Sequence, residues 1–133
     1  TTNLLNLFMK DTSAGASHNS IGSSSNQFGE FDVNGFQSVI AIKLDDLNQI
    51  EGVPSPNHIK LDVDGKELEI LEGAANILSG INSILVEMEG INLDENLEKI
   101  ENILAMAGLE EELSWRNKGS RRNRLYLRKY SNE

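Results

Sequence analysis

The sequence predicts an α/β fold in which parallel strands are covered by helices and a β-hairpin closes the sheet. Short apolar segments alternate with longer segments whose apolar residues recur at helical spacing. The segment SILVEME at residues 83–89 is almost continuously apolar, which is typical of parallel strands buried on both faces. With 133 residues, the chain is expected to form a single domain.

The first 35 residues are predicted to contain one strand and one long loop. Residues 4–9 are apolar enough for a short strand. The stretch DTSAGASHNSIGSSSNQFGE that follows is rich in Ser, Gly and Asn and has no periodicity, which indicates a loop. Loops of this length in compact domains are often functional.

The middle of the chain is predicted to contain two strands and a helix. SVIAIKL at residues 38–44 forms the first strand, and NHIKLDV at residues 57–63 forms the second after a break at Pro54 and Pro56. Apolar residues at helical spacing then predict one helix over residues 66–79. Its first turns are acidic, as the positive end of the helix dipole favours.

The last third is predicted to contain a strand, a helix and a hairpin. The strand is residues 83–89, and the helix covers residues 93–107 with a capping box from Asn92 and Glu95 and a stop at Gly108. EELSWRN at residues 111–117 and RLYLRKY at residues 124–130 are predicted to be the two strands of the hairpin.

Composition excludes several classes of function. The formal net charge of −9 repels phosphate backbones and anionic membranes, so we expect no nucleic-acid partner and no membrane partner. The chain has no cysteine, which excludes disulfides, thiolate zinc sites and a cysteine nucleophile. No apolar run approaches the roughly 20 residues that span a bilayer, and the amino-terminal residues do not resemble a signal peptide. We therefore expect a cytoplasmic location.

The motif D-V-D-G at residues 62–65 ends the predicted strand 57–63 and has two possible readings. The first is phosphoryl transfer of the haloacid-dehalogenase kind, in which the first aspartate of such a motif is a nucleophile. The mid-chain position, Lys66 after the motif, and the upstream location of the adjacent pair Asp45 and Asp46 all argue against this reading. A calcium-binding loop is also disfavoured, because Gly73 falls where the loop needs its last acid.

The second reading comes from the longer stretch HIKLDVDGKELEILEGAANILSGINSILVEMEG. It resembles the signature of FkbM-type methyltransferases, in which a strand I-K-I-D-V-E-G is followed by A-E, an apolar helix ending near G-A and a strand closing on V-E. Asp64 replaces the usual Glu and Lys66 the usual Ala. SVIAIKLDDL and RNRLYLRK are similar to further family segments, so the family-like core covers residues 36–129. The matching positions are Asp62, Gly65, Glu67, Gly73, Ala74 and Glu87.

The resemblance implies the carboxyl-terminal part of a class I methyltransferase fold, with a partial Rossmann-like sheet. It also implies S-adenosylmethionine as cofactor and methyl transfer to a hydroxyl of a small molecule or sugar. No glycine-rich turn for the cofactor lies in residues 1–44, so no cofactor-binding residue is assigned and we expect the isolated chain to be inactive. We therefore expect the chain to be a truncation, a partial reading frame or a split protein, three alternatives that stay open here. The alternative function is a non-catalytic remnant or interaction module.

The resemblance suggests two groups of site residues. Asp62, Glu87 and His18 are the catalytic candidates, with Asp62 orienting a hydroxyl or taking its proton as general base. Asp64, Glu67 and Asn19 are the substrate-binding candidates. Four of them have a structural alternative: Asp62 caps the following turn, Asp64 and Glu67 are acids of a helix start, and His18 has no role. No metal site is predicted, although two carboxylates could hold a divalent ion.

The strand 57–63 is predicted to be central in the complete sheet. Without a preceding cofactor half, one of its edges would present unpaired backbone N–H and C=O groups, which are a template for another strand. We expect this edge to bind the missing amino-terminal half or a second copy of the chain.

Overall fold

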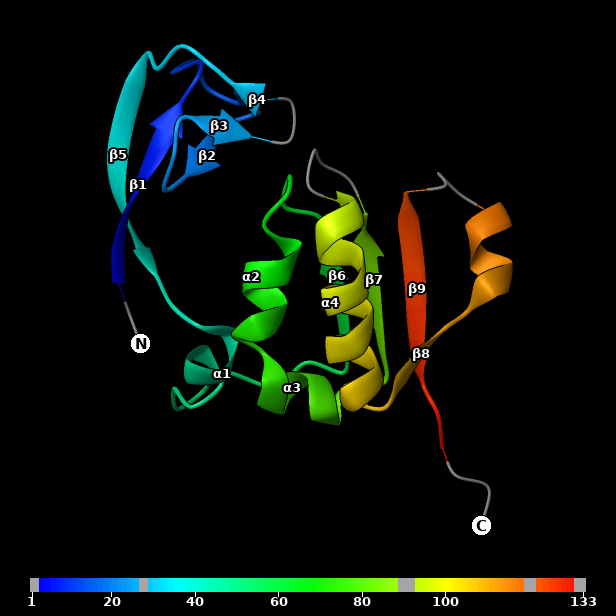
Figure 1. The fold of residues 1–133 in the computed structure, drawn as a ribbon. Helices are drawn as coiled ribbons and strands as arrows, with labels where there is room; N and C mark the ends of the chain where they lie inside the picture. Colours follow the sequence, from blue (N-terminus) through cyan, green and yellow to red (C-terminus); the bar gives the residue numbers. More distant parts are fainter. Residues whose placement is uncertain (1–2, 27–28, 89–92, 119–121, 131–133) are drawn as a thin grey trace.

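The computed structural model describes residues 3–26, 29–88, 93–118 and 122–130. In these residues the strands form a three-stranded sheet of order β2-β1-β5, a two-stranded ladder of β3 and β4, and a four-stranded sheet of order β6-β7-β9-β8. Figure 1 shows the first two groups apart from the four-stranded sheet, which carries helices α2, α3 and α4.

The amino-terminal sheet is built on β1 (Asn3–Met9) and β5 (Gly35–Ala41), which pair antiparallel along their whole lengths. The predicted strand 4–9 is confirmed. The strand predicted at 38–44 lies three residues earlier, because its register with β1 runs from residue 35 to residue 41 and α1 (Leu44–Leu47) then begins. The predicted loop carries three two-residue strands, which are β2 (Ser20–Ile21), β3 (Ser25–Asn26) and β4 (Gly29–Glu30).

The four-stranded sheet is mixed. β6 (His58–Leu61) and β7 (Ser83–Glu87) are parallel, whereas β9 (Asn123–Arg128) is antiparallel to both β7 and β8 (Leu109–Glu111). The α/β class is therefore confirmed. In the described residues only β6 and β7 pair in parallel. A complete Rossmann-like parallel sheet is therefore not confirmed.

The single helix predicted over residues 66–79 is wrong. The structure has two short helices, α2 (Glu67–Glu72) and α3 (Ala75–Gly80), separated at Gly73 and Ala74. The carboxylate of Asp45 causes the break: its oxygens accept hydrogen bonds from the backbone N–H groups of Asn76 (3.0 Å) and Ile77 (2.9 Å). These amides begin a new helix and do not continue the first one.

The helix predicted over residues 93–107 is confirmed as α4 (Leu93–Met106), and Gly108 at φ +77° ends it. The predicted capping residue Asn92 lies outside the described residues.

The strand predicted at 111–117 is wrong, because β8 ends at Glu111 and the chain continues as the 3-10 helix η1 (Leu113–Asn117). Glu112 accepts the backbone N–H of Ser114 (3.1 Å), and Arg116 folds back onto Glu111 (2.5 Å). These local contacts close a turn where the pattern predicted extended chain.

The core lies on one face of the four-stranded sheet. Along β7, Ile84 and Val86 are buried against the helices, whereas Ser83, Leu85 and Glu87 on the opposite face are only half-buried. Figure 1 shows α2, α3 and α4 together on the covered face. The expectation that β7 is buried on both faces is therefore wrong for the described residues.

Candidate functional site

The turn after β6 has an unusual backbone. β6 ends at Leu61, and Asp64 (φ +56°) and Gly65 (φ +94°) then adopt the left-handed region in succession before α2 begins. Glycine adopts this region without penalty and aspartate tolerates it better than most residues. The motif D-V-D-G therefore turns the chain sharply at the strand end and fixes the side chains of both aspartates there.

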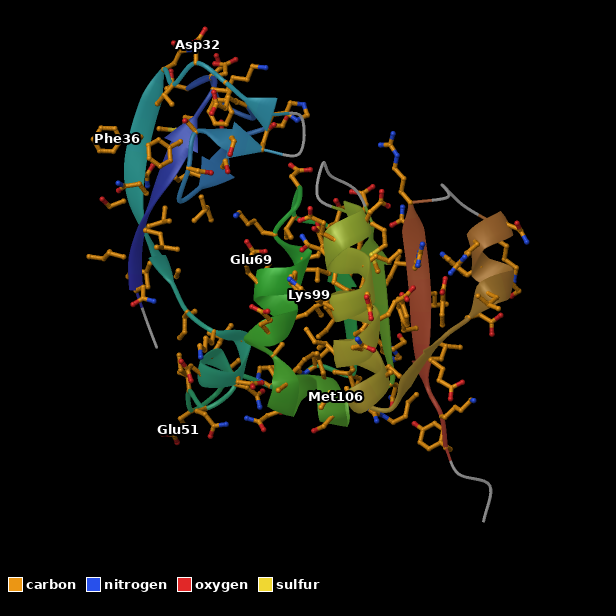
Figure 2. The ribbon with its side chains drawn as sticks, viewed as in Figure 1. Asp32, Phe36, Glu51, Glu69, Lys99 and Met106 are labelled. Atoms are coloured by element: carbon orange, nitrogen blue, oxygen red, sulfur yellow. The ribbon has the colours of Figure 1, made fainter. Side chains whose placement is uncertain are left out.

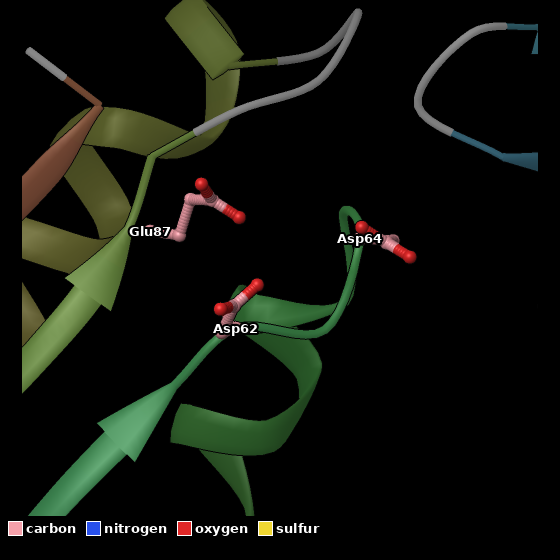
Figure 3. A group of neighbouring side chains, drawn as sticks. All are labelled: Asp62, Asp64 and Glu87. Atoms are coloured by element: carbon pink, nitrogen blue, oxygen red, sulfur yellow. The ribbon is translucent and has the colours of Figure 1, made fainter. Parts of the chain in front are cut away.

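Three carboxylates meet at this turn. Asp62, Asp64 and Glu87 each offer an oxygen, and these oxygens all lie within 4.8 Å of one another. Figure 3 shows Asp62 and Glu87 at the ends of neighbouring strands and Asp64 on the turn. Asp62 and Glu87 come together because β6 and β7 are parallel, so their carboxyl ends lie at the same edge of the sheet. We call these three residues the carboxylate cluster.

Lys60 forms an ion pair with one residue of this cluster. Its Nζ lies 2.6 Å from Oδ2 of Asp62, and the side chain of Asp62 is 40% exposed. The hydrogen bond from Lys60 holds the pKa of Asp62 below its usual range, and a hydrogen bond with the Glu87 carboxyl acts in the same direction. The pKa of Lys60 is raised for the reciprocal reason. Asp62 is therefore ionised at neutral pH, accessible, and able to accept a hydrogen bond from a ligand.

The carboxylate cluster alone does not assign a metal site, because exposed acidic groups of this kind are common without an ion. Its chemistry suits two kinds of ligand group. Ionised carboxylates accept hydrogen bonds from hydroxyls, and a surplus of negative charge attracts a cation and repels an anion.

Glu67 lies away from the cluster, at the start of α2. Its side chain is buried, with the residue 6% exposed, and Oε1 accepts the backbone N–H of Gly65 (3.2 Å). Glu67 therefore accepts a hydrogen bond from the backbone of the turn. Capping this turn was the structural role expected as the alternative for Asp62. Its predicted contact with a substrate remains a prediction.

His18 and Asn19 lie in the amino-terminal part of the fold. The backbone of His18 is in the left-handed region, with φ +63°. Its side chain lines a hollow of about 510 Å³ together with Lys10 and Asn34. No residue of the carboxylate cluster lines that hollow. Asn19 accepts the backbone N–H of Lys10 through Oδ1 (3.1 Å). The structure thus brings together three of the six predicted residues, namely Asp62, Asp64 and Glu87.

Two residues that matter here were not among the candidates. Lys60 could have been found from its spacing, because residues i and i+2 of a strand lie on the same face and a lysine so placed can reach the carboxylate of Asp62. Asp45 stands in the segment similar to the family's L-D-x-L, and the structure gives it the role of capping α3.

Comparisons with known proteins identify the family. A family model described as the methyltransferase FkbM domain matches residues 3–121. The chain is also 33% identical over 84 residues to the hexuronic acid methyltransferase AglP of Haloferax volcanii, a match that covers 63% of this chain and 34% of that protein. The chain thus spans about a third of the length of this relative. No solved structure matches.

The family match decides between the two readings of D-V-D-G, because the matched region includes the whole motif and its following helices. Among the described residues, no helix is long and apolar enough to cross a membrane. The resemblance to FkbM-type methyltransferases is confirmed: this chain belongs to the FkbM methyltransferase domain family.

Proposed function

We propose that this chain carries the acceptor side of an S-adenosylmethionine-dependent O-methyltransferase site, with Asp62 acting on the hydroxyl that receives the methyl group. The observation that supports this proposal is the meeting of Asp62 and Glu87 at the ends of adjacent parallel strands, in a chain of a methyltransferase family. This edge is where open α/β sheets bind their ligands.

The acceptor that fits best is a sugar hydroxyl. The relative named as a hexuronic acid methyltransferase suggests a sugar substrate, and a hexuronic acid offers both hydroxyls and a carboxylate for methylation. The carboxylate cluster repels a second anion, and its nearby cation Lys60 already pairs with Asp62. A neutral hydroxyl, in contrast, can donate a hydrogen bond to Asp62.

Asp62 would act in two ways. Its ionised carboxylate accepts the hydroxyl hydrogen bond and thereby orients an oxygen lone pair for attack, and it then takes the proton as the oxygen becomes an ether. Lys60 donates a hydrogen bond to this carboxylate and lowers its pKa, and Glu87 contacts it from the neighbouring strand. The reaction does not need a strong base, because S-adenosylmethionine supplies an electrophilic methyl group when it is bound.

The described residues fit the acceptor better than the cofactor. The negative cluster suits the cationic sulfonium, but the turn after β6 carries acidic side chains and is not a glycine-rich turn of the kind that binds a nucleotide cofactor. We therefore assign no residue of this chain to the adenosine or methionine parts of the cofactor.

A chimera tests the proposal. This chain replaces the matched third of the Haloferax volcanii relative, and methyl transfer from S-adenosylmethionine to a hexuronic acid glycoside is measured. Asp62→Asn should lower kcat by about 10²- to 10⁴-fold, the usual effect of losing a general base, and leave the Kd of S-adenosylmethionine unchanged. Asp94→Asn on the exposed side of α4 is the matched control and should change neither value. Unchanged kcat in Asp62→Asn would refute the proposal.

A further inference from the structure

Two hollows lie at one end of the amino-terminal sheet, where β1 ends and β5 begins. One is the hollow of about 510 Å³ that His18 lines, and the other has a volume of about 560 Å³. Lys10 and Asn34 line both hollows, so the two adjoin. Figure 2 shows Asp32, which lines the larger hollow, at the end of this sheet opposite to α1. We call the two hollows together the distal groove, and its lining includes Lys10, His18, Glu30, Phe31, Asp32 and Asn34.

Hydrogen bonds within the amino-terminal part of the fold fix the walls of the distal groove. Nδ2 of Asn34 donates to the carbonyl of Lys10 (2.5 Å), and Nδ2 of Asn26 donates to the carbonyl of His18 (2.8 Å). The second bond restrains His18 in the left-handed region, which is uncommon for residues other than glycine and is often found in segments that bind ligands. Groups that are fixed before a ligand arrives lose less conformational entropy on binding.

The fold leaves several polar groups of the distal groove unused. Among the described residues, the ammonium of Lys10 and the carboxylates of Glu30 and Asp32 take part in no ion pair. Oδ1 of Asn34 accepts no hydrogen bond from a described residue. The groove therefore offers both donors and acceptors to a ligand.

The charges of the distal groove select against an anion. Asp11, Glu30 and Asp32 contribute carboxylates, whereas Lys10 contributes an ammonium. This surplus of negative charge repels a phosphate or a carboxylate. In the described residues these acids belong to no group of three that could hold a metal ion. A neutral ligand that carries hydroxyls fits the balance of charge.

A neutral sugar has the chemistry that the larger hollow requires. Its hydroxyls can donate to the carboxylates of Glu30 and Asp32 and can accept from the ammonium of Lys10. Its C–H groups form an apolar face, and the half-buried ring of Phe31 offers an apolar surface in the same hollow. The backbone N–H of Phe31 donates to the carbonyl of Ser24 (3.0 Å), which fixes the chain at this point. The volume of about 560 Å³ lies within the usual range of ligand sites.

The distal groove is separate from the carboxylate cluster but is connected to its surroundings through the β3–β4 ladder. No residue of the cluster lines either hollow, whereas Glu30 of β4 lines the larger one. Figure 3 shows this ladder beyond Asp64, and Figure 1 shows it near the turn between β6 and α2. A sugar in the groove would thus be a different unit from the one that contacts Asp62.

We infer that the distal groove is a subsite for a neutral sugar unit of the acceptor, next along the glycan to the unit whose hydroxyl receives the methyl group. This inference rests on the proposed function and makes the preferred acceptor an oligosaccharide. Glu30 and Asp32 accept hydrogen bonds from the hydroxyls of the neutral unit, Lys10 donates to them, and its C–H face packs on Phe31.

The chimera tests the subsite through its choice of acceptor. Methyl transfer is measured with the methyl glycoside of a hexuronic acid and with disaccharides in which that acid is linked to glucose, galactose or mannose. At least one disaccharide should have a KM about tenfold lower than that of the monosaccharide, which is equivalent to about 1.4 kcal/mol of additional binding. Asp32→Ala should remove most of this difference and leave kcat and the KM of the monosaccharide unchanged. Gln37→Ala, at an exposed position of β5 that lines neither hollow, is the control and should keep the difference.

Equal KM values for the monosaccharide and all the disaccharides would overturn the inference. The side-chain amide signal of Asn34 in an NMR spectrum of the chimera gives a second readout that does not need methyl transfer. Titration with the disaccharides should shift this signal for at least one of them, and the shift should be lost in Asp32→Ala. A shift without methyl transfer would contradict the proposed function and support the subsite, whereas methyl transfer without any shift would contradict the subsite alone.

Discussion

Replacing Arg128 tests how the last strand holds the helices against the sheet. The guanidinium of this half-buried residue donates from Nε to the carbonyl of Ile81 (2.6 Å), from Nη1 to that of Ala107 (2.9 Å) and from Nη2 to that of Leu78 (2.6 Å). These carbonyls lie at or just beyond the carboxyl ends of α3 and α4. One cation therefore serves two helix ends that lack internal partners and whose dipoles favour positive charge.

The size of the effect follows from these three contacts. A hydrogen bond to a charged group contributes about 1.5–3 kcal/mol, so three would give at least about 4.5 kcal/mol if the carbonyls remained dry. Because Arg128 is half-buried, water can reach part of this site, and we expect Arg128→Met to lower the free energy of unfolding by about 3 kcal/mol. For a chain of this size that corresponds to a melting temperature about 10 °C lower.

Urea denaturation followed by circular dichroism measures the change. Arg128→Lys should lose about 2 kcal/mol, because an ammonium cannot reach three separated carbonyls as the planar guanidinium does. Lys129→Met is the control: Lys129 pairs with Glu110 at the surface, and exposed pairs contribute at most about 1 kcal/mol. An Arg128→Met variant within 1 kcal/mol of the wild type, with an unchanged denaturant slope, would refute this reasoning.

Three further predictions concern the turn and the helix break. Asp45→Ala should lower the free energy of unfolding by about 1–2 kcal/mol in urea denaturation, because two amides of α3 lose their acceptor, and a wild-type value would contradict the cap. The free energy of unfolding of Asp64→Gly should stay within about 0.5 kcal/mol of the wild-type value. That of Asp64→Val should be about 2 kcal/mol lower, because a β-branched residue resists φ +56°. Equal stabilities of the two variants would argue against a left-handed turn. Lys60→Met should raise the pKa of Asp62 in a carbon-13 NMR titration, since Lys60 is the main cause of its lowered pKa. The stabilising effect of a lowered pKa is present above the unfolded pKa of about 3.9 and is lost as the pH falls through the folded pKa. The free energy of unfolding of Lys60→Met should therefore fall less on acidification than that of the wild type. Identical Asp62 titrations in the two proteins would contradict the pairing.

Local patterns predicted the part of the fold that carries the site. Strand β6, its turn and strand β7 follow from apolar periodicity and from a motif of adjacent residues, and so does the meeting of Asp62 with Glu87, because the carboxyl ends of parallel strands lie together. Helix α4 and its stop at Gly108 are equally local.

Contacts between distant residues decided what the sequence did not predict. The break between α2 and α3 depends on Asp45, which lies 31 residues before the amide that it accepts. The shift of β5 depends on its register with β1, and the open face of β7 depends on which elements are present to cover it. The η1 helix was missed because the polar residues that close its turn also fit an exposed strand.

The chemical nature of the transferred methyl group tests the proposed function most directly. The chimera is incubated with S-adenosylmethionine labelled in its methyl group and a hexuronic acid glycoside, and the product is treated with mild alkali. Transfer to a hydroxyl beside Asp62 predicts an ether, so the label stays on the sugar and its amount falls in Asp62→Asn. Release of the label as methanol would show an ester on the carboxylate and would contradict the hydroxyl acceptor and the role of Asp62.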